Sequence, residues 1–240
     1  MKWYIPREHG AWAMVIVPYW LGAGMTGVTF NHIIFFIGLF SLYFAQAPLL
    51  TYLRQPKHQD VWPSFFIYVT FGSFFLVPNF IVDLSLFYIA LIIFPFFFIN
   101  LVFAKLKKER LFLNDLSAII ALSAFLLFSY QIGNNTLLLE AFYYMFVVVA
   151  FFVGSVFHVK SLLREKGNIT FRRISVLYHI GMVVIMFVFV STGAGVAFLI
   201  SLVKTVAMPK KYLKKPIQIG IVEIINSSFF IIAVLFSYYG

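Results

Sequence analysis

Apolar residues occupy this chain in long runs, and polar residues gather in the short segments between them. The runs lie at 11–30, 33–53, 61–80, 84–104, 113–132, 138–157, 174–191, 193–208 and 217–238. A helix needs about 20 apolar residues to cross the hydrocarbon of a bilayer. The pattern therefore predicts an all-α, polytopic transmembrane bundle of about nine spans, forming a single domain over residues 1–240. The run at 193–208 is short, so a hairpin of the seventh and eighth runs that does not fully cross is an open alternative.

Composition places the chain in the membrane class. Of its 240 residues 62% are hydrophobic and 11% are charged, and the mean hydropathy is +0.98. Soluble domains are about half apolar and about a quarter charged. A net charge of +10 would suggest nucleic acid as the partner of a soluble protein, but here topology accounts for it and no nucleic acid is expected. The chain has no Cys, which excludes disulfides, thiolate metal sites and cysteine nucleophiles.

The basic residues all belong to one side of the predicted membrane. They precede the first run, follow the second, fourth and sixth runs, and lie at the end of the eighth run and in the loop after it. These five groups contain all 18 Lys and Arg residues, and the other loops contain none. Because cytoplasmic loops are rich in Lys and Arg, the N-terminus is expected inside and the C-terminus outside.

Other polar groups on the same side are not needed for topology. His179 and Glu223 fall inside the seventh and ninth runs, and Asn100 lies in the last turn of the fourth. An ionisable group below the membrane surface is costly and is a functional hypothesis by default. The alternative for each residue is an interhelical hydrogen bond that holds the bundle together.

Four stretches mix basic, acidic and histidine residues, namely "REHG" at 7–10, "YLRQPKHQD" at 52–60, "NLVFAKLKKERLFLND" at 100–115 and "HVKSLLREK" at 158–166. Arg forks onto phosphate or carboxylate and Lys adds a point charge, so these stretches predict a cytoplasm-facing pocket for a small anionic or amphiphilic ligand. The predicted ligand-binding residues are Arg7, Glu8, His9, Arg54, Lys57, His58, Asn100, Lys105, Glu109, Arg110, Asp115, His158, Lys160, Arg164, His179 and Glu223. Attraction to anionic lipid headgroups is the alternative, and it fits the bare lysine cluster at 210–215 better.

Smaller expectations concern individual residues of these stretches. Lys105 and Glu109 are spaced to pair on one helical face, and Asn114 and Asp115 are placed to cap the fifth helix. No two histidines have the i,i+4 spacing of a helical metal site, so no metal is expected and no cofactor is named.

Two resemblances add to this picture. The stretches "PREHGAWAM", "NLVFAKLKKERLFLNDL" and "HVKSLLREKGN" resemble the YwiC-like family of bacterial integral membrane proteins over essentially the whole chain. That resemblance implies the bacterial cytoplasmic (inner) membrane and names no activity. At the level of fold, Arg7, Pro18 and Gly22 and the positions of the polar loops resemble the UbiA-type intramembrane prenyltransferases. Those enzymes carry Asp-rich motifs for Mg²⁺ in the loops after the second and sixth helices, where this chain has Asp60 alone.

Two functions of different classes follow. One is a UbiA-like intramembrane transferase without the Asp-rich motifs, acting on a phosphate-bearing lipid or isoprenoid. The alternative is a transporter of a small anion or amphiphile. A transporter needs polar groups toward both faces, and the outer side has only His32, Asp83 and Glu140 as ionisable side chains, which favours a one-sided binding site slightly. In that case Arg7, Lys57 and His158 are expected to point into a central cavity open to the cytoplasm.

Overall fold

The computed structural model describes residues 2–6, 9–208 and 216–240, and within these ranges the regular structure is helical. The helices are α1 (His9–Thr26), α2 (Phe30–Arg54), a short 3₁₀ helix η1 (Gln59–Val61), α3 (Trp62–Val82), α4 (Ser85–Lys105), α5 (Phe112–Ser123), α6 (Phe125–Asn134), α7 (Leu139–Leu163), α8 (Ile169–Phe189), α9 (Thr192–Ala207) and α10 (Pro216–Tyr239). The predicted all-α, polytopic helical bundle is confirmed.

The helices correspond to the nine apolar runs of the sequence. Seven helical segments of the described chain are long and apolar enough to cross a membrane, and Ala11–Thr26 and Thr192–Ala207 are shorter apolar helices. The seventh run is a full-length helix of 21 residues, α8. The 16 residues of α9 reach about 24 Å, less than the hydrocarbon thickness of about 30 Å. The fifth run is one span made of α5 and α6, which are separated at Ala124.

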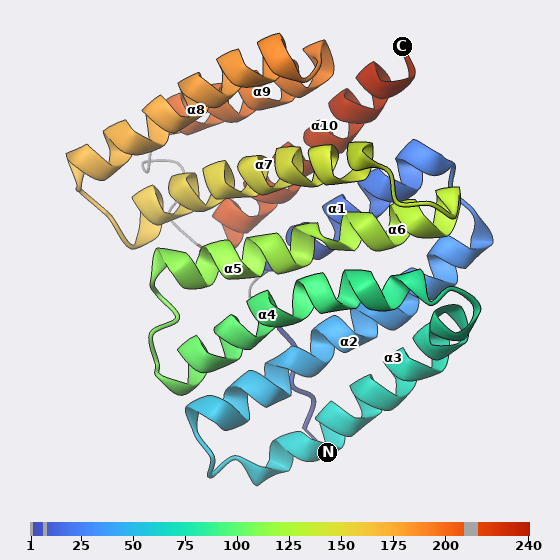
Figure 1. The fold of residues 1–240 in the computed structure, drawn as a ribbon. Coiled ribbons are helices and arrows are strands. Elements are labelled where there is room, and N and C mark those ends of the chain that lie inside the picture. The colour runs from blue at the N-terminus through green and yellow to red at the C-terminus, as the bar shows by residue number, and fades with distance from the viewer. Residues whose placement is uncertain (1, 7–8, 209–215) are drawn as a thin grey trace. The chain divides into compact units, whose positions relative to one another are not determined.

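The chain divides into two compact units, and each is described by itself. The N-terminal unit consists of residues 1–7 and 18–142, and the C-terminal unit of residues 8–17 and 143–240. In the N-terminal unit α2 and α3 lie side by side as an antiparallel pair (Figure 1). Their contact centres on two glycines, because a Cβ on Gly38 would lie 3.0 Å from the carbonyl oxygen of Gly72. Small residues at a crossing let helix backbones approach closely in a membrane.

The C-terminal unit is built from α7, α8, α9 and α10, with α9 packed on both α8 and α10. Its apolar core has two layers along the helices. In one layer the rings of Phe151 and Phe230 stack with their centroids 4.1 Å apart, and Phe198 packs edge-on against both. In the other, Leu162 of α7 packs with Ile219 of α10. Each layer is about one to two helical turns from the polar residues that lie between them on α7 and α10.

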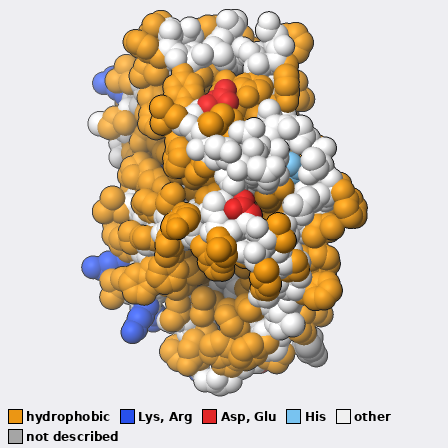
Figure 2. Space-filling view, turned by 45° about the vertical axis from the view of Figure 1, so that its right-hand side comes forward, with side chains coloured by type: hydrophobic (Ala, Val, Ile, Leu, Met, Phe, Trp, Pro, Cys, Tyr) orange, Lys and Arg blue, Asp and Glu red, His pale blue; other side chains and the backbone are white. Residues whose placement is uncertain are grey.

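Hydrophobic side chains also dominate the surface. Figure 2 shows one face on which they cover most of the visible area, with few charged side chains among them. Large exposed residues such as Phe74 and Phe236 would be unfavourable in water but suit contact with lipid acyl chains. The exposed surface therefore agrees with the membrane assignment.

Candidate functional site

An ion pair is buried inside the C-terminal unit. Lys204 of α9 donates from Nζ to both carboxylate oxygens of Glu223 on α10, at 2.7 Å to Oε1 and 2.8 Å to Oε2. Ser155 of α7 donates its hydroxyl to Oε2 of the same carboxylate at 2.6 Å. Lys204 is 7% exposed and Glu223 is 3% exposed. Because moving two charges out of water is expensive, such a pair persists only when each charge stays neutralised by its partner.

His158 of α7 lies against this pair without a hydrogen bond of its own. Its Nε2 is 3.9 Å from Oε1 of Glu223, beyond hydrogen-bond distance. Among the described residues neither ring nitrogen has a hydrogen-bond partner, although the side chain is 1% exposed. Buried polar groups are nearly always hydrogen-bonded, so each exception calls for an explanation.

His179 of α8 completes the group. Its Nδ1 donates to the carbonyl oxygen of Ser175 at 2.7 Å, which leaves Nε2 of the neutral ring as an acceptor. Nε2 is 3.3 Å from the hydroxyl of Thr205, which donates to the carbonyl oxygen of Ser201 at 2.8 Å. One hydroxyl hydrogen therefore faces two acceptors. We call Lys204, Glu223, His158 and His179 the charged cluster.

Polar contacts continue from the charged cluster along α9 and α10. Ser201 and Asn226 are hydrogen-bonded, with 3.1 Å between Nδ2 of Asn226 and Oγ of Ser201. Asn226 lies three residues after Glu223 and so on the same face of α10. The charged cluster is enclosed by the two apolar layers, and a low-dielectric surrounding of this kind strengthens electrostatic interactions.

The N-terminal unit has a buried histidine of a different kind. His32, in the first turn of α2, accepts a hydrogen bond on Nδ1 from the backbone N–H of Thr29 at 3.0 Å. Its Nε2 therefore carries the proton and donates to the carbonyl oxygen of Ser129 on α6 at 2.9 Å. The hydroxyl of Tyr19 donates to the carbonyl oxygen of His32 at 2.7 Å.

The next two residues of α6 also bind ionisable groups. Tyr130 donates to the carboxylate of Glu140 at 2.9 Å, and Gln131 donates to Oδ2 of Asp83 at 2.8 Å. Ser85 donates to Oδ1 of Asp83 from both its backbone and its hydroxyl. Burial alone would raise the pKa of Asp83, but the hydrogen bonds from Ser85 and Gln131 outweigh it and lower that pKa. We call the contacts of Ser129, Tyr130 and Gln131 with His32, Glu140 and Asp83 the α6 network.

Comparison with known proteins identifies the family. The family described as YwiC-like protein matches residues 5–130. The chain belongs to the YwiC-like family. It is 33% identical over 235 residues to "Uncharacterized protein YwiC" of Bacillus subtilis (strain 168), covering 96% of each chain. It is 29% identical over 236 residues to an "Uncharacterized protein" of Haemophilus influenzae, covering 98% of each chain. No solved structure matches this chain, so the predicted UbiA-type resemblance stays a prediction.

Three of the predicted ligand-binding residues of this YwiC-like chain come together in the charged cluster, namely His158, His179 and Glu223. The fourth member of the charged cluster is Lys204, which the sequence predicts only as a topological charge at the end of the eighth run. Lys204 lies within α9, where it is buried and paired with the carboxylate of Glu223. Its contact with Glu223 changes its assignment from a surface charge to a site residue.

Two other groupings of predicted residues form in the N-terminal unit. Arg54, at the end of α2, donates from Nε to Glu109 at 2.9 Å and 3.0 Å. The expected pairing of Glu109 with Lys105 along one helix is wrong, because α4 ends at Lys105. Asn100 donates to the carbonyl oxygen of Asn114 at 2.8 Å. The expected cap of α5 by Asn114 or Asp115 is also wrong, since the N-cap is Leu111 without a side-chain cap.

The remaining predicted residues are dispersed. His58 contacts the side chain of Gln55 at 2.9 Å, and its Nδ1 is 3.8 Å from Asp60. A hydrogen bond from the hydroxyl of Tyr4 lowers the pKa of Asp60. Lys57, Lys105, Arg110 and Arg164 are exposed, Lys160 is buried in the last turn of α7, and Asp115 lies in the first turn of α5. Arg7 and Glu8 and the side chain of His9 lie outside the described part of the chain.

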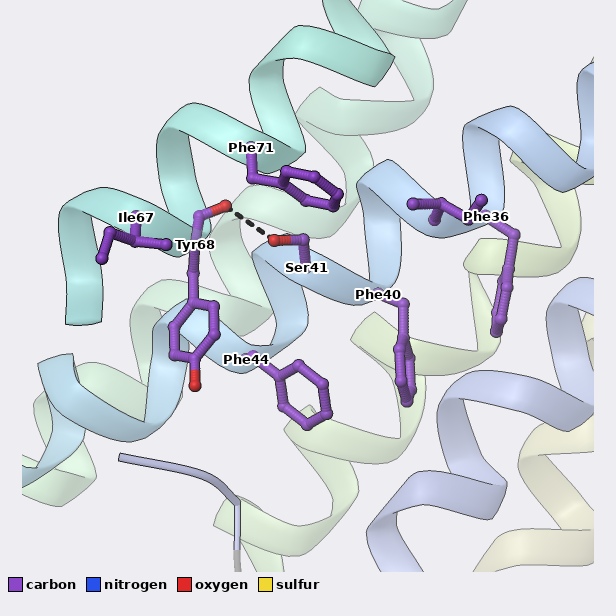
Figure 3. Close-up of a pocket in the computed structure, with 8 residues that line it drawn as sticks. Phe36, Phe40, Ser41, Phe44, Ile67, Tyr68 and Phe71 are labelled. Atoms are coloured by element: carbon purple, nitrogen blue, oxygen red, sulfur yellow. Dashed lines mark hydrogen bonds between the residues drawn. The ribbon is translucent and has the colours of Figure 1, made fainter. Parts of the chain in front are cut away.

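Two surface hollows of the described residues lie away from these charges. One lies between α2 and α3 and the other on α3 alone, and aromatic side chains supply most of their lining. In the one shown in Figure 3, Phe36, Phe40 and Phe44 follow one another along α2 beside Phe71 of α3. In this hollow Ser41 donates a hydrogen bond to the carbonyl oxygen of Tyr68. None of the predicted ligand-binding residues lines either hollow, so the prediction that Lys57 and His158 point into a cavity gains no support from these hollows.

Among the described residues no group of three His, Asp or Glu side chains is arranged to hold a metal ion. The charged cluster has one carboxylate, and a lysine already neutralises it. We take the charged cluster as the candidate functional site.

Proposed function

We propose that this protein is a transporter of a small anion in the bacterial cytoplasmic membrane, with the charged cluster as the site that holds the anion. One observation carries the proposal, namely the buried pair of Lys204 and Glu223 beside His158, whose ring nitrogens have no hydrogen-bond partner in the described part of the chain. A contact that only held the helices together would satisfy the polar groups that it buries. Charges that face the interior of a membrane bundle commonly mark the path of a substrate or an ion.

The residues of the charged cluster suit an anion. Lys204 is a point charge on a flexible stem, and it binds Glu223 through interactions that another carboxylate or phosphate oxygen would reproduce. Ser155 and Asn226 provide further donors on two neighbouring helices. One lysine neutralises one negative charge, so a monovalent anion is the chemistry that fits.

The position of the charged cluster favours transport over surface catalysis. His179 is ten residues from the start of α8, or about 15 Å along a helix that spans the membrane. Along the helices, the layer of Phe151, Phe198 and Phe230 lies on one side of the charged cluster, and the layer of Leu162 and Ile219 lies on the other. Two apolar layers around a buried site can act as gates that open in turn, as alternating access requires.

The contacts of the N-terminal unit weigh against a pocket of free cations there. Glu109 neutralises Arg54, the basic residue at the end of α2. Asp60, the lone acid of the loop that would carry an Asp-rich motif in a prenyltransferase, accepts a hydrogen bond from Tyr4 at 2.6 Å. The described residues of the N-terminal unit include no buried Lys, Arg, Asp or Glu that would support the transferase hypothesis in a comparable way, so we prefer the transporter.

Uptake of labelled anions into vesicles tests the proposal. The purified protein would be reconstituted in phosphatidylethanolamine and phosphatidylglycerol and offered acetate, lactate, gluconate, nitrate and phosphate in turn. We expect saturable uptake of at least one of these anions above that of protein-free vesicles. The double variant Lys204→Met/Glu223→Gln should abolish that uptake and still fold, because replacing both partners of a buried ion pair with neutral side chains is often tolerated.

Ser228→Ala is the matched control, since Ser228 is an exposed residue of α10 bonded to its own helix. It should transport like the wild type. Equal uptake by the wild type and the double variant would contradict the proposal.

A further inference from the structure

With Lys204 and Glu223 charged and both histidines neutral, the charged cluster carries no net charge. Lys204 and Glu223 cancel, and His158 and His179 are uncharged in their neutral forms. A proton added alone would leave a buried charge of plus one, and a monovalent anion added alone would leave minus one. Either unpaired charge is costly in an apolar interior, whereas both added together keep the site neutral.

We propose that the charged cluster takes up one proton together with one monovalent anion, and that Nε2 of His158 is the atom that accepts the proton. This inference rests on the proposed function and adds its coupling ion. The geometry assigns the proton to His158 because its Nε2 faces Oε1 of Glu223, the same oxygen that Lys204 binds.

The exchange follows from these contacts. When an anion binds to Nζ of Lys204, the lysine leaves the carboxylate of Glu223. The protonated Nε2 of His158, 3.9 Å away, then moves about 1 Å closer and donates to Oε1 in place of the lysine. Lys204 holds the anion and His158 holds Glu223, so two neutral pairs replace one. Release of the anion restores the first pair and frees the proton.

The described ionisable groups that act on His158 come from α8, α9 and α10. Glu223 of α10 attracts a proton on Nε2, and Lys204 of α9 repels it until an anion neutralises the lysine. His179 of α8 also acts electrostatically on His158, and its own Nδ1 is committed to Ser175. Proton uptake at His158 is therefore controlled by whether Lys204 is bound to Glu223 or to the anion.

The proton is measured beside the anion in the same vesicles. Vesicles loaded with a pH-sensitive dye would receive each anion of the panel, and both the label and the internal pH would be followed. We expect one proton for each anion, uptake that is insensitive to membrane potential, and about tenfold accumulation of the anion for each pH unit of an imposed gradient. His158→Gln should lower the ratio of protons to anions toward zero and make the remaining uptake sensitive to membrane potential.

The outcomes separate the two proposals. Anion uptake without proton movement in the wild type would overturn the coupling and leave the transporter intact. His158→Gln with an unchanged proton ratio would overturn the assignment to His158 and indicate protonation of Glu223 instead. If no anion of the panel enters, the proposed function fails, and this inference fails with it. Thermal unfolding and gel filtration of His158→Gln confirm that the variant compared is folded.

Discussion

The α6 network and the charged cluster each combine a buried histidine with carboxylates, which are half-buried in the α6 network and buried in the charged cluster, but the two sites satisfy these groups differently. In the α6 network both ring nitrogens of His32 are bonded, one to Thr29 and the other to Ser129. In the charged cluster His158 is equally buried and has no hydrogen bond among the described residues. Burial alone does not distinguish the two histidines, whereas the count of hydrogen bonds does.

The carboxylates differ in the same way. Asp83 lies between α3 and α4 and accepts hydrogen bonds from the neutral side chains of Gln131 and Ser85. Glu223 lies within α10 and depends on a cation, Lys204. Hydrogen bonds from neutral side chains hold the Asp83 carboxylate without a cation that another anion could displace, whereas a carboxylate that depends on one cation is open to exchange when another anion arrives. We therefore read the α6 network as structural and the charged cluster as functional.

Removing Lys204 should have the largest effect. Lys204→Met leaves Glu223 buried without its cation, and breaking a buried ion pair from one side costs about 3–5 kcal/mol of the free energy of unfolding. Adding Glu223→Gln to the same chain should recover most of that loss. Equilibrium unfolding of the detergent-solubilised protein, followed by circular dichroism, measures both variants.

An exposed ion pair supplies the control for this prediction. Arg54 and Glu109 are bonded at a helix end where Arg54 is 46% exposed, and pairs of that kind contribute about 0–1 kcal/mol. Arg54→Ala should therefore destabilise the protein much less than Lys204→Met. Equal losses for the two variants would mean that the burial of Lys204 has no energetic importance.

The two histidines give the sharpest test of the comparison. His32→Leu leaves the N–H of Thr29 and the carbonyl oxygen of Ser129 without their partner, and each unsatisfied buried group costs about 1–3 kcal/mol. His158→Leu removes no hydrogen bond that the described residues make, so we expect little loss of stability or a small gain. Denaturant midpoints of the two variants measure the difference.

Anion uptake should depend on the two histidines in the opposite way, with the larger effect from the His158 variant. His32→Leu that remains folded should keep uptake, and His158→Leu should uncouple it from protons. Similar losses of stability in the two variants would indicate that His158 has a structural role like that of His32.

Much of the fold follows from hydropathy, because a membrane span is specified by length and apolar composition. The runs at 33–53 and 138–157 are confirmed as α2 and α7, each a helix of 25 residues. The interruption between α5 and α6 was not predicted. Ala124 and its neighbours are apolar or small, and a change in hydrogen bonding from one turn to the next leaves no mark in hydropathy.

The candidate site could be predicted only in part. His158, His179 and Glu223 stand out because ionisable groups are rare inside spans. The charge pattern of the sequence assigns Lys204 to the cytoplasmic side, although it is the one Lys or Arg inside any of the nine predicted runs. Ser201 and Thr205 lie beside Lys204 on one side of its helix. This polar stripe, and the need of Glu223 for a cation inside the membrane, are the sequence signals that identify Lys204 as a site residue. The partner of each charge could not be predicted, because pairing depends on helix packing.

Asp83 gives the smallest and most specific test of the structural reading. Its pKa in the folded protein lies below the ordinary Asp value of 3.8, so the folded state binds fewer protons than the unfolded state between the two pKa values. Its contribution to stability is present above the unfolded pKa and is lost as the pH falls through the folded pKa. The free energy of unfolding should therefore decline below about pH 4, and Asp83→Asn should reduce that decline.

Ser85→Ala removes one of the hydrogen bonds to Asp83 and should give an intermediate slope, while Ser228→Ala should match the wild type. The same slope in Asp83→Asn and the wild type would show that the hydrogen bonds from Gln131 and Ser85 do not favour the charged form, and the α6 network would then lose its role as the permanently satisfied counterpart of the charged cluster.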